Sequence, residues 1–161
     1  MFYTLRIYTK NRKKRCLSMI LGAYAYLRMN GNGKEAVAFY ENALEAEILG
    51  LQTYGELPEN PEFPLPAEAK GRVVHAQLKV GSTFLMLSDT FPGQPYQTGS
   101  QVDVAITLND ADKSKAIFQK LQEGGEVIMP LQETPWSPSY GQVKDKFGIT
   151  WQLSTIAENF S

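Results

Sequence analysis

Apolar and polar positions follow two different periods in the first half of the chain. Residues 24–30 alternate with period two, which is typical of a strand with one buried face. Residues 34–44 repeat apolar side chains every three or four positions, which predicts an amphipathic helix. Three further stretches have strand character, and a tight turn at Gly81-Ser82 joins the last two: residues 47–54, 73–80 and 83–89.

The second half of the chain repeats this order of elements. At an offset of 79 residues, Asn30 falls on Asn109. At an offset of 67, residues 79–86 (KVGSTFLM) fall on residues 146–153 (KFGITWQL). The repeat predicts a second helix over residues 112–123, begun by Asp112. The strands of this second copy are expected near residues 102–108, 126–130, 140–147 and 149–155.

A glycine-rich turn stands between the first strand and the first helix. Its residues Gly31, Gly33 and Ala36 match the G-x-G-x-x-A pattern that binds the pyrophosphate of dinucleotides. The repeat aligns Gly33 with Asp112, and glycine and aspartate are both common at helix N-caps. The strand before the turn contains Arg28, whereas the first strand of a dinucleotide-binding fold is almost wholly apolar. We therefore expect the glycines to turn the chain and expect no cofactor.

The first eighteen residues are strongly basic. Residues 1–18 contain six Lys and Arg and no acidic residue, which leaves a net charge of −7 on the rest of a chain whose total is −1. A basic run before an apolar stretch is typical of a signal peptide, and a basic arm also binds acidic partners. Cleavage after Ala25 would remove part of the first strand. We therefore interpret residues 1–18 as a basic N-terminal extension and residues 19–161 as a single domain.

The acidic body limits the classes of partner. Nucleic-acid binding requires basic side chains gathered on one face, so no nucleic-acid partner is expected. No apolar stretch reaches the length of a membrane span, so no membrane partner is expected. Cys16 is the only cysteine, which excludes an internal disulfide and is typical of the reducing cytoplasm. We expect a cytoplasmic protein.

Three segments of the chain resemble a known superfamily. These are AFYENALEAEI at residues 38–48, RVVHAQLKVGSTFLMLSD at residues 72–89 and QETPWSPSYGQVKDKFGITWQL at residues 132–153. Together with the repeat, they resemble the vicinal oxygen chelate superfamily of glyoxalases, bleomycin-resistance proteins and extradiol dioxygenases. Within it they are similar to the PhnB-like branch. The resemblance covers about residues 22–155.

The resemblance implies an α+β fold made of two βαβββ modules, at about residues 22–90 and 100–156. The modules would form an eight-stranded, half-open sheet around a cavity, with the helices on its outer side. Many members are homodimers, and those with chemistry hold a divalent metal through side chains of the first and last strands. We expect a homodimer whose interface includes the loops at residues 55–72 and 131–139.

Strand alternation predicts which side chains face the cavity. In the first strand of each copy, Tyr24 and Arg28 share this side with Asp103. His75 lies on the same side of its own strand. Arg28 then has two alternative roles, because it can grip an anionic ligand in bidentate fashion or pair with Asp103.

The superfamily's metal positions fall on Tyr24, Leu85, Asp103 and Gln152. The offset of 67 predicts that Leu85 and Gln152 face the cavity from the two closing strands. Leucine has no donor atom, and a neutral tyrosine is a poor ligand for a divalent ion. Two oxygen donors alone do not make a zinc or nickel site, so we expect no catalytic metal.

Three further residues are candidates for the site. His75 is the only histidine, and its unperturbed pKa suits proton transfer near neutrality, although a lone strand histidine is more often structural. Glu133 is a candidate catalytic acid that more often caps a backbone or points to water. Trp136 lies between Pro135 and Pro138, where it covers the cavity, the partner subunit or only the core.

Two functional hypotheses follow from the sequence. The first is a metal-free protein that binds a small polar or anionic molecule in its cavity, with Tyr24, Arg28, His75, Asp103, Trp136 and Gln152 as its ligand-binding residues. The alternative is a superfamily enzyme. Its chemistry would be of the lyase or dioxygenase type, assisted by a metal, or metal-free with His75 as the base.

Overall fold

The computed structural model describes residues 22–156, and the predicted basic extension at residues 1–18 lies outside them. The first module consists of β1 (Ala25–Met29), α1 (Gly33–Leu44), β2 (Glu47–Thr53), the 3-10 turn η1 (Tyr54–Glu56), α2 (Ala67–Lys70), β3 (Val73–Val80) and β4 (Thr83–Asp89). The second module consists of β5 (Val104–Leu108), α3 (Ala111–Leu121), β6 (Glu126–Thr134), β7 (Ser137–Lys144) and β8 (Thr150–Thr155).

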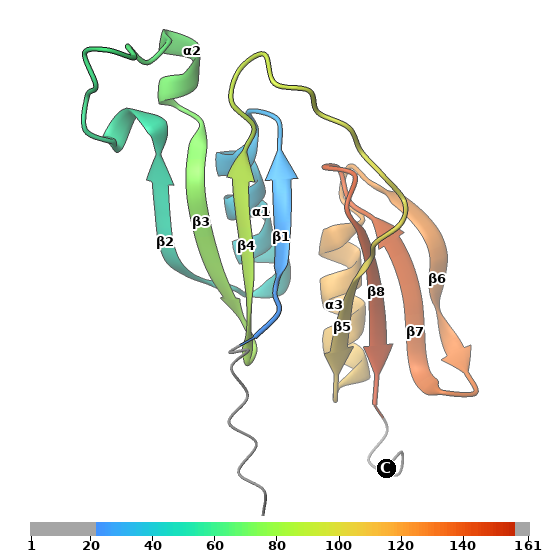
Figure 1. Cartoon of the computed structure of the whole chain (residues 1–161). Coiled ribbons are helices and arrows are strands. Elements are labelled where there is room, and N and C mark those ends of the chain that lie inside the picture. The colour runs from blue at the N-terminus through green and yellow to red at the C-terminus, as the bar shows by residue number, and fades with distance from the viewer. Residues whose placement is uncertain (1–21, 157–161) are drawn as a thin grey trace, which may run out of the picture.

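Each module folds into a four-stranded sheet with one long helix against it (Figure 1). The strand orders are β1-β4-β3-β2 and β5-β8-β7-β6. The β1–β4 and β5–β8 pairs are parallel and the other pairs are antiparallel. The predicted α+β fold with two βαβββ modules is confirmed. Its eight strands form two sheets rather than one continuous sheet, and β1 and β5 lie at the facing edges.

The predicted helix starts require a correction. Helix α1 begins at Gly33 with Asn32 as its N-cap residue, and α3 begins at Ala111 with Asp110 as its N-cap residue. The Asp110 side chain accepts a 3.0 Å hydrogen bond from the backbone N–H of Lys113. The prediction that Asp112 begins the second helix is therefore wrong. The aspartate two residues earlier satisfies the unpaired N–H group.

The predicted loop at residues 131–139 is also wrong. Strands β6 and β7 continue through it, and Thr134 pairs with Ser137 across a two-residue turn at Pro135-Trp136. Register shifts along β6 accommodate the irregular pairing, and β6 is the outer strand of its sheet. β6 contains Pro130, and proline is tolerated on an outer strand because the position that lacks an N–H can face away from the sheet.

The glycine-rich turn holds a carboxylate of the chain itself. Gly31 has a φ of +89°, and the N–H groups of Gly31 and Gly33 donate to Asp89 Oδ1 at 2.7 and 3.0 Å. The other oxygen, Oδ2, accepts from the backbone of Val73 at 2.7 Å. A Cβ atom on Gly33 would lie only 2.7 Å from Asp89 Oδ2. The glycines do turn the chain, and Asp89 occupies the anion-binding end of the helix.

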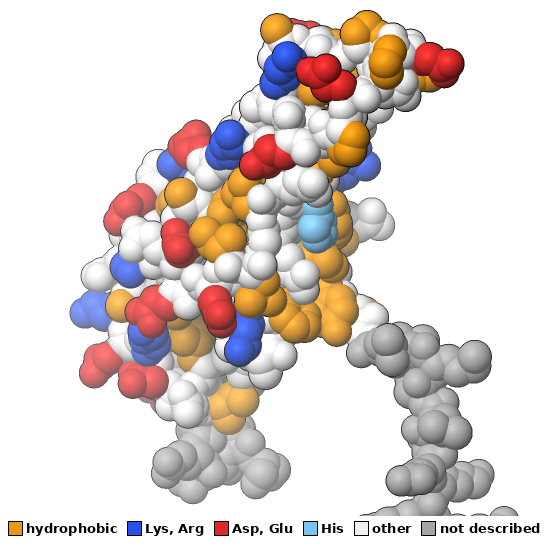
Figure 2. Space-filling view, turned by 90° about the vertical axis from the view of Figure 1, so that its left-hand side faces the viewer, with side chains coloured by type: hydrophobic (Ala, Val, Ile, Leu, Met, Phe, Trp, Pro, Cys, Tyr) orange, Lys and Arg blue, Asp and Glu red, His pale blue; other side chains and the backbone are white. Residues whose placement is uncertain are grey.

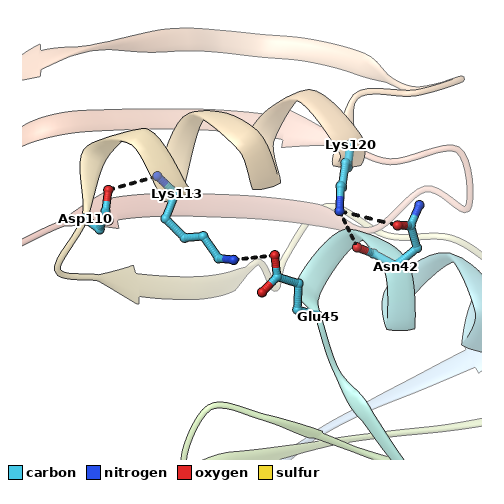
Figure 3. A network of polar contacts seen from close by, with 5 residues as sticks. All are labelled: Asn42, Glu45, Asp110, Lys113 and Lys120. Carbon is cyan, nitrogen blue, oxygen red and sulfur yellow. Dashed lines mark hydrogen bonds and ion pairs between the residues drawn. The ribbon is translucent and has the colours of Figure 1, made fainter.

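Side chains of both modules form one hydrophobic core between the sheets and the helices. On the outer side, α1 and α3 are also joined by polar contacts (Figure 3). Lys113 forms an ion pair with Glu45, and Lys120 Nζ donates to the backbone oxygen of Asn42 at 2.9 Å. The two helices therefore hold the modules together behind the sheets.

Within residues 22–156, no helix covers the opposite faces of the sheets (Figure 1). Charged side chains gather on one side of the molecule, and hydrophobic side chains gather near the histidine on the other (Figure 2). Between residues 22 and 156, no helix is long and apolar enough to cross a membrane.

Candidate functional site

Strand alternation places most of the predicted site residues on the open faces of the sheets. Tyr24 lies just before β1 and Arg28 lies within it, and both are exposed. Leu27, between them, is buried against the helix. His75 is exposed on β3, and Asp103 is exposed just before β5. The orientation predicted from the alternation is therefore correct for these strands.

The predicted orientation of Leu85 is wrong. Leu85 is 4% exposed and belongs to the hydrophobic core, and it pairs with Ala25 of β1. Trp151 occupies the equivalent position in the second module, where it pairs with Val104. Met86 is therefore the counterpart of Gln152 and lies on the open side. A shift of one residue exchanges the two faces of a strand, because side chains alternate with period two.

A chain of hydrogen bonds crosses the open face of the second sheet. Gln142 Nε2 donates to the Tyr140 hydroxyl at 2.8 Å, and this hydroxyl donates to Gln152 Oε1 at 2.9 Å. Gln152 Nε2 in turn donates to Asp103 Oδ2 at 2.8 Å. Strands β7 and β8 and the residue just before β5 thus contribute to one network, in which each group donates to the next. It fixes the amide orientation of Gln152 and leaves Asp103 Oδ1 available as an acceptor.

An exposed tryptophan extends this network toward the hairpin tip. Trp136 is 59% exposed in the β6–β7 turn, and its ring meets the Tyr140 ring at 5.7 Å and 75°. This edge-to-face packing orients the indole beside the polar network. Glu133 precedes this turn in β6 and is exposed, with no hydrogen bond or ion pair to another described residue.

Aromatic side chains dominate the open face of the first sheet. Tyr24 packs edge to face on Phe84 at 5.5 Å, and the Tyr26 ring lies 6.1 Å from the imidazole of His75. The Tyr26 hydroxyl lies 3.5 Å from His75 Nδ1, at the long limit of a hydrogen bond. This face is therefore more apolar than that of the second sheet.

A pocket of about 480 Å³ lies between β1, the connection from β4 to β5, and the start of β8. Of the described residues that line it, Arg28 is the only charged one. Hydroxyl and amide side chains supply its other polar groups: Tyr26, Thr90, Tyr96, Gln97, Thr98, Gln101 and Thr150. Its volume lies in the range of small-molecule sites.

A larger pocket, of about 810 Å³, lies between the start of β1 and the length of β5. Its lining includes Tyr24 and Asp103, and its depth reaches the buried side chain of Trp151. The predicted site residues therefore do not converge on one cavity. Arg28 lines the first pocket, whereas His75, Trp136 and Gln152 line neither of the two.

Arg28 and Asp103 form no ion pair. The ion pairs among residues 22–156 instead join Lys79 to Glu47, Lys113 to Glu45, and Lys146 to Glu35. The alternative in which Arg28 serves to brace Asp103 therefore has no contact to support it.

The donor set at the superfamily's metal positions is weak. Correcting the register replaces Leu85 by Met86, whose thioether is not among the usual Cys, His, Asp and Glu ligands of zinc and does not suit hard ions such as magnesium. Gln152 already uses both amide atoms, and Asp103 uses one carboxylate oxygen. No three His, Cys, Asp or Glu side chains between residues 22 and 156 come together as a possible metal site.

Sequence reasoning missed two kinds of residue. Tyr140 joins the network because it lies two residues before Gln142 in β7, and period-two alternation places both side chains on the same face. Tyr96 and Gln101 line the smaller pocket from the connection between the modules. That connection has no periodic pattern, so nothing in the sequence indicates which way its side chains point.

The chain is similar to known proteins. Protein YjdN of Escherichia coli strain K12 is 28% identical over 140 residues, which cover 83% of this chain and 94% of YjdN. The crystal structure of PA1353 from Pseudomonas aeruginosa is 33% identical with a TM-score of 0.76, covering 86% of this chain and all of that one. A PhnB protein from Bacillus cereus is 25% identical with a TM-score of 0.67, covering 83% and 98%.

The sequence model that matches extends over nearly the whole of both modules. It spans residues 25–153, from the first residue of β1 to the interior of β8. The repeat, the paired βαβββ modules and this match agree, and the chain belongs to the Glyoxalase/Bleomycin resistance protein/Dioxygenase superfamily.

Proposed function

We propose that the protein binds a small anionic molecule in the 480 Å³ pocket, with Arg28 as the group that neutralises the ligand's charge. The observation that carries this proposal is the absence of any other charge among the described lining residues. A guanidinium with no acidic neighbour in the pocket binds a carboxylate or phosphate without first breaking an internal ion pair. The surrounding hydroxyl and amide groups supply further hydrogen bonds.

The proposal includes binding without a resident catalytic metal. It is supported by the weak donor set at Tyr24, Met86, Asp103 and Gln152. The alternative is a superfamily enzyme that uses a metal at Asp103 and Gln152, or His75 as a base. The contact between Tyr26 and His75 gives little support to His75 as a base, because the 3.5 Å distance is long for a hydrogen bond.

A thermal-shift screen tests the binding proposal directly. The panel contains small carboxylates, phosphate esters and sulfonates, and the proteins are the full chain, Arg28→Gln and Lys79→Gln. Lys79 is a matched control, because it is exposed on β3 but does not line the pocket. We expect anions to raise the melting temperature of the full chain and of Lys79→Gln, and not of Arg28→Gln. An undiminished shift in Arg28→Gln would overturn the assignment.

Recovery of the bound molecule separates binding from catalysis. A ligand that returns unchanged after incubation with the protein supports a binding protein. Conversion of the ligand would support the enzyme alternative, and its loss in His75→Asn would identify the base.

We also propose that the protein is a cytoplasmic homodimer. Exposed aromatic side chains support an interface, because such groups are enriched at interface cores. Phe63, in the loop at residues 55–72, is 76% exposed, and Trp136 is 59% exposed. Light scattering at micromolar concentration tests this, and a monomer mass would contradict it.

A further inference from the structure

The two pockets are neighbours, and we refer to the pair as the groove. Both are lined by Ala25, Val102 and Val104, which lie along the seam where β1 faces β5. These strands are the edge strands of their sheets, and Figure 1 shows the connection from β4 crossing above the gap between them and running in front of the second sheet before it enters β5. Val102 belongs to that connection and is 80% exposed. An elongated molecule can therefore extend from one pocket to the other along this residue.

The two halves of the groove differ in chemical character. Among the described residues that line the smaller half, Arg28 is the only charged one. The larger half is lined mainly by apolar side chains, and its depth is formed by residues of the hydrophobic core: Leu44, Ile106, Leu108, Ile117 and Trp151.

Two charged residues also line the larger half. Lys113 is paired with Glu45 of the neighbouring helix, so its charge is neutralised locally. The Asp103 carboxylate accepts a hydrogen bond from Gln152, and its negative charge disfavours an anionic group nearby. An anion therefore has one favourable end of the groove, next to Arg28.

We propose that the groove binds an anionic amphiphile. Its carboxylate, phosphate or sulfonate group pairs with Arg28, and its apolar chain passes Val102 into the 810 Å³ pocket. The inference rests on the proposed function, because it takes the same contact at Arg28 and adds the chemical class of the rest of the ligand. The driving force of the added part is the removal of apolar surface from water.

A homologous series of ligands measures the contribution of the chain. Each methylene that enters the apolar pocket is expected to tighten binding about fourfold. Calorimetric titration of the full chain with butanoate, hexanoate, octanoate and decanoate, below micelle-forming concentrations, gives this slope. Arg28→Gln should weaken all four acids by a similar factor, because it changes only the contact with the head group.

A substitution in the larger pocket tests where the chain lies. Ala105 lines that pocket on the exposed side of β5 and does not line the smaller one. Ala105→Trp should leave the affinity for butanoate unchanged and abolish most of the gain from longer chains. Ala116→Trp is the control, because Ala116 is exposed on α3 and lines neither pocket.

The outcomes distinguish the inference from the function on which it rests. If short acids bind through Arg28 and longer chains add nothing, the inference fails and the proposed function stands. If no acid binds in an Arg28-dependent way, both fail. If Ala105→Trp instead lowers the mass measured by light scattering and leaves the chain-length slope intact, a second copy covers the pocket and the inference is overturned.

Discussion

The hydroxyl of Tyr40 donates a 2.8 Å hydrogen bond to Asp145 Oδ2, and this contact joins α1 of the first module to the β7–β8 loop of the second. The same carboxylate accepts the indole N–H of Trp151 at 2.8 Å. Its other oxygen accepts the backbone N–H groups of Phe147 and Ile149 at 2.9 and 3.0 Å. Asp145 is 3% exposed, so these four donors stabilise a buried charge that both modules share.

Tyr40→Phe should lower the free energy of unfolding by about 1.5–3 kcal/mol, the usual contribution of a hydrogen bond to a charged group. The ring stays in place, so the loss comes from the hydroxyl alone. Urea denaturation measures it. Tyr54→Phe is the control, because the Tyr54 hydroxyl makes no hydrogen bond to another described residue, and it should change stability by less than about 0.5 kcal/mol.

Alkaline pH should destabilise the protein through the same contact. Burial, reinforced by the negative charge of Asp145, raises the pKa of Tyr40 far above its usual value. The unfolded chain loses this phenol proton above about pH 10, whereas the folded chain retains it. Stability from Tyr40 is therefore fully present below about pH 10 and falls as the pH rises further. Urea midpoints measured on both sides of this pH should fall more steeply for the full chain than for Tyr40→Phe.

Arg28→Ala should leave stability within about 0.5 kcal/mol of the unchanged protein, because Arg28 is exposed and unpaired with Asp103. Asp103→Ala should cost no more than about 1 kcal/mol, since it loses one exposed hydrogen bond. The double substitution should equal the sum of the two. Large, non-additive losses in chemical denaturation would show that the two residues do brace the modules.

Gly33→Ala should destabilise the protein by about 1–3 kcal/mol, the usual cost of overpacking. Its new Cβ would lie 2.7 Å from Asp89 Oδ2, and this carboxylate is held by three backbone N–H groups. Gly50→Ala is the matched control, because a Cβ there has nothing within 4 Å. Equal melting temperatures for the two variants would contradict the close packing of Asp89 against the turn.

Protein purified without chelator should contain substoichiometric divalent metal by elemental analysis. The reason is the donor set, in which Met86 offers a thioether and Gln152 already uses both amide atoms. One tightly held ion per chain would contradict this expectation and favour the enzyme alternative.

The repeat in the sequence was sufficient to predict the two modules and the open faces of β1, β3, β5 and β8. Local periodicity determines these features, because a strand with one buried face shows alternating apolar residues. The same reasoning was wrong for β4. It aligned Gly81 with Gly148, and both glycines do turn the chain with positive φ. The two hairpins differ in length, however: four residues separate the paired Lys79 and Phe84, whereas five separate the paired Lys144 and Thr150.

The sequence by itself determined which elements form and which face of most strands is buried, since these depend on neighbours within a few residues. Only the tertiary structure decided the register of the closing strands β4 and β8, because a difference of one residue in hairpin length moves every later side chain to the other face of the sheet. It also brought Tyr40 to Asp145 and divided Arg28 and Asp103 between two pockets of one seam. These contacts join residues far apart in the chain, and no local pattern encodes which distant partners meet.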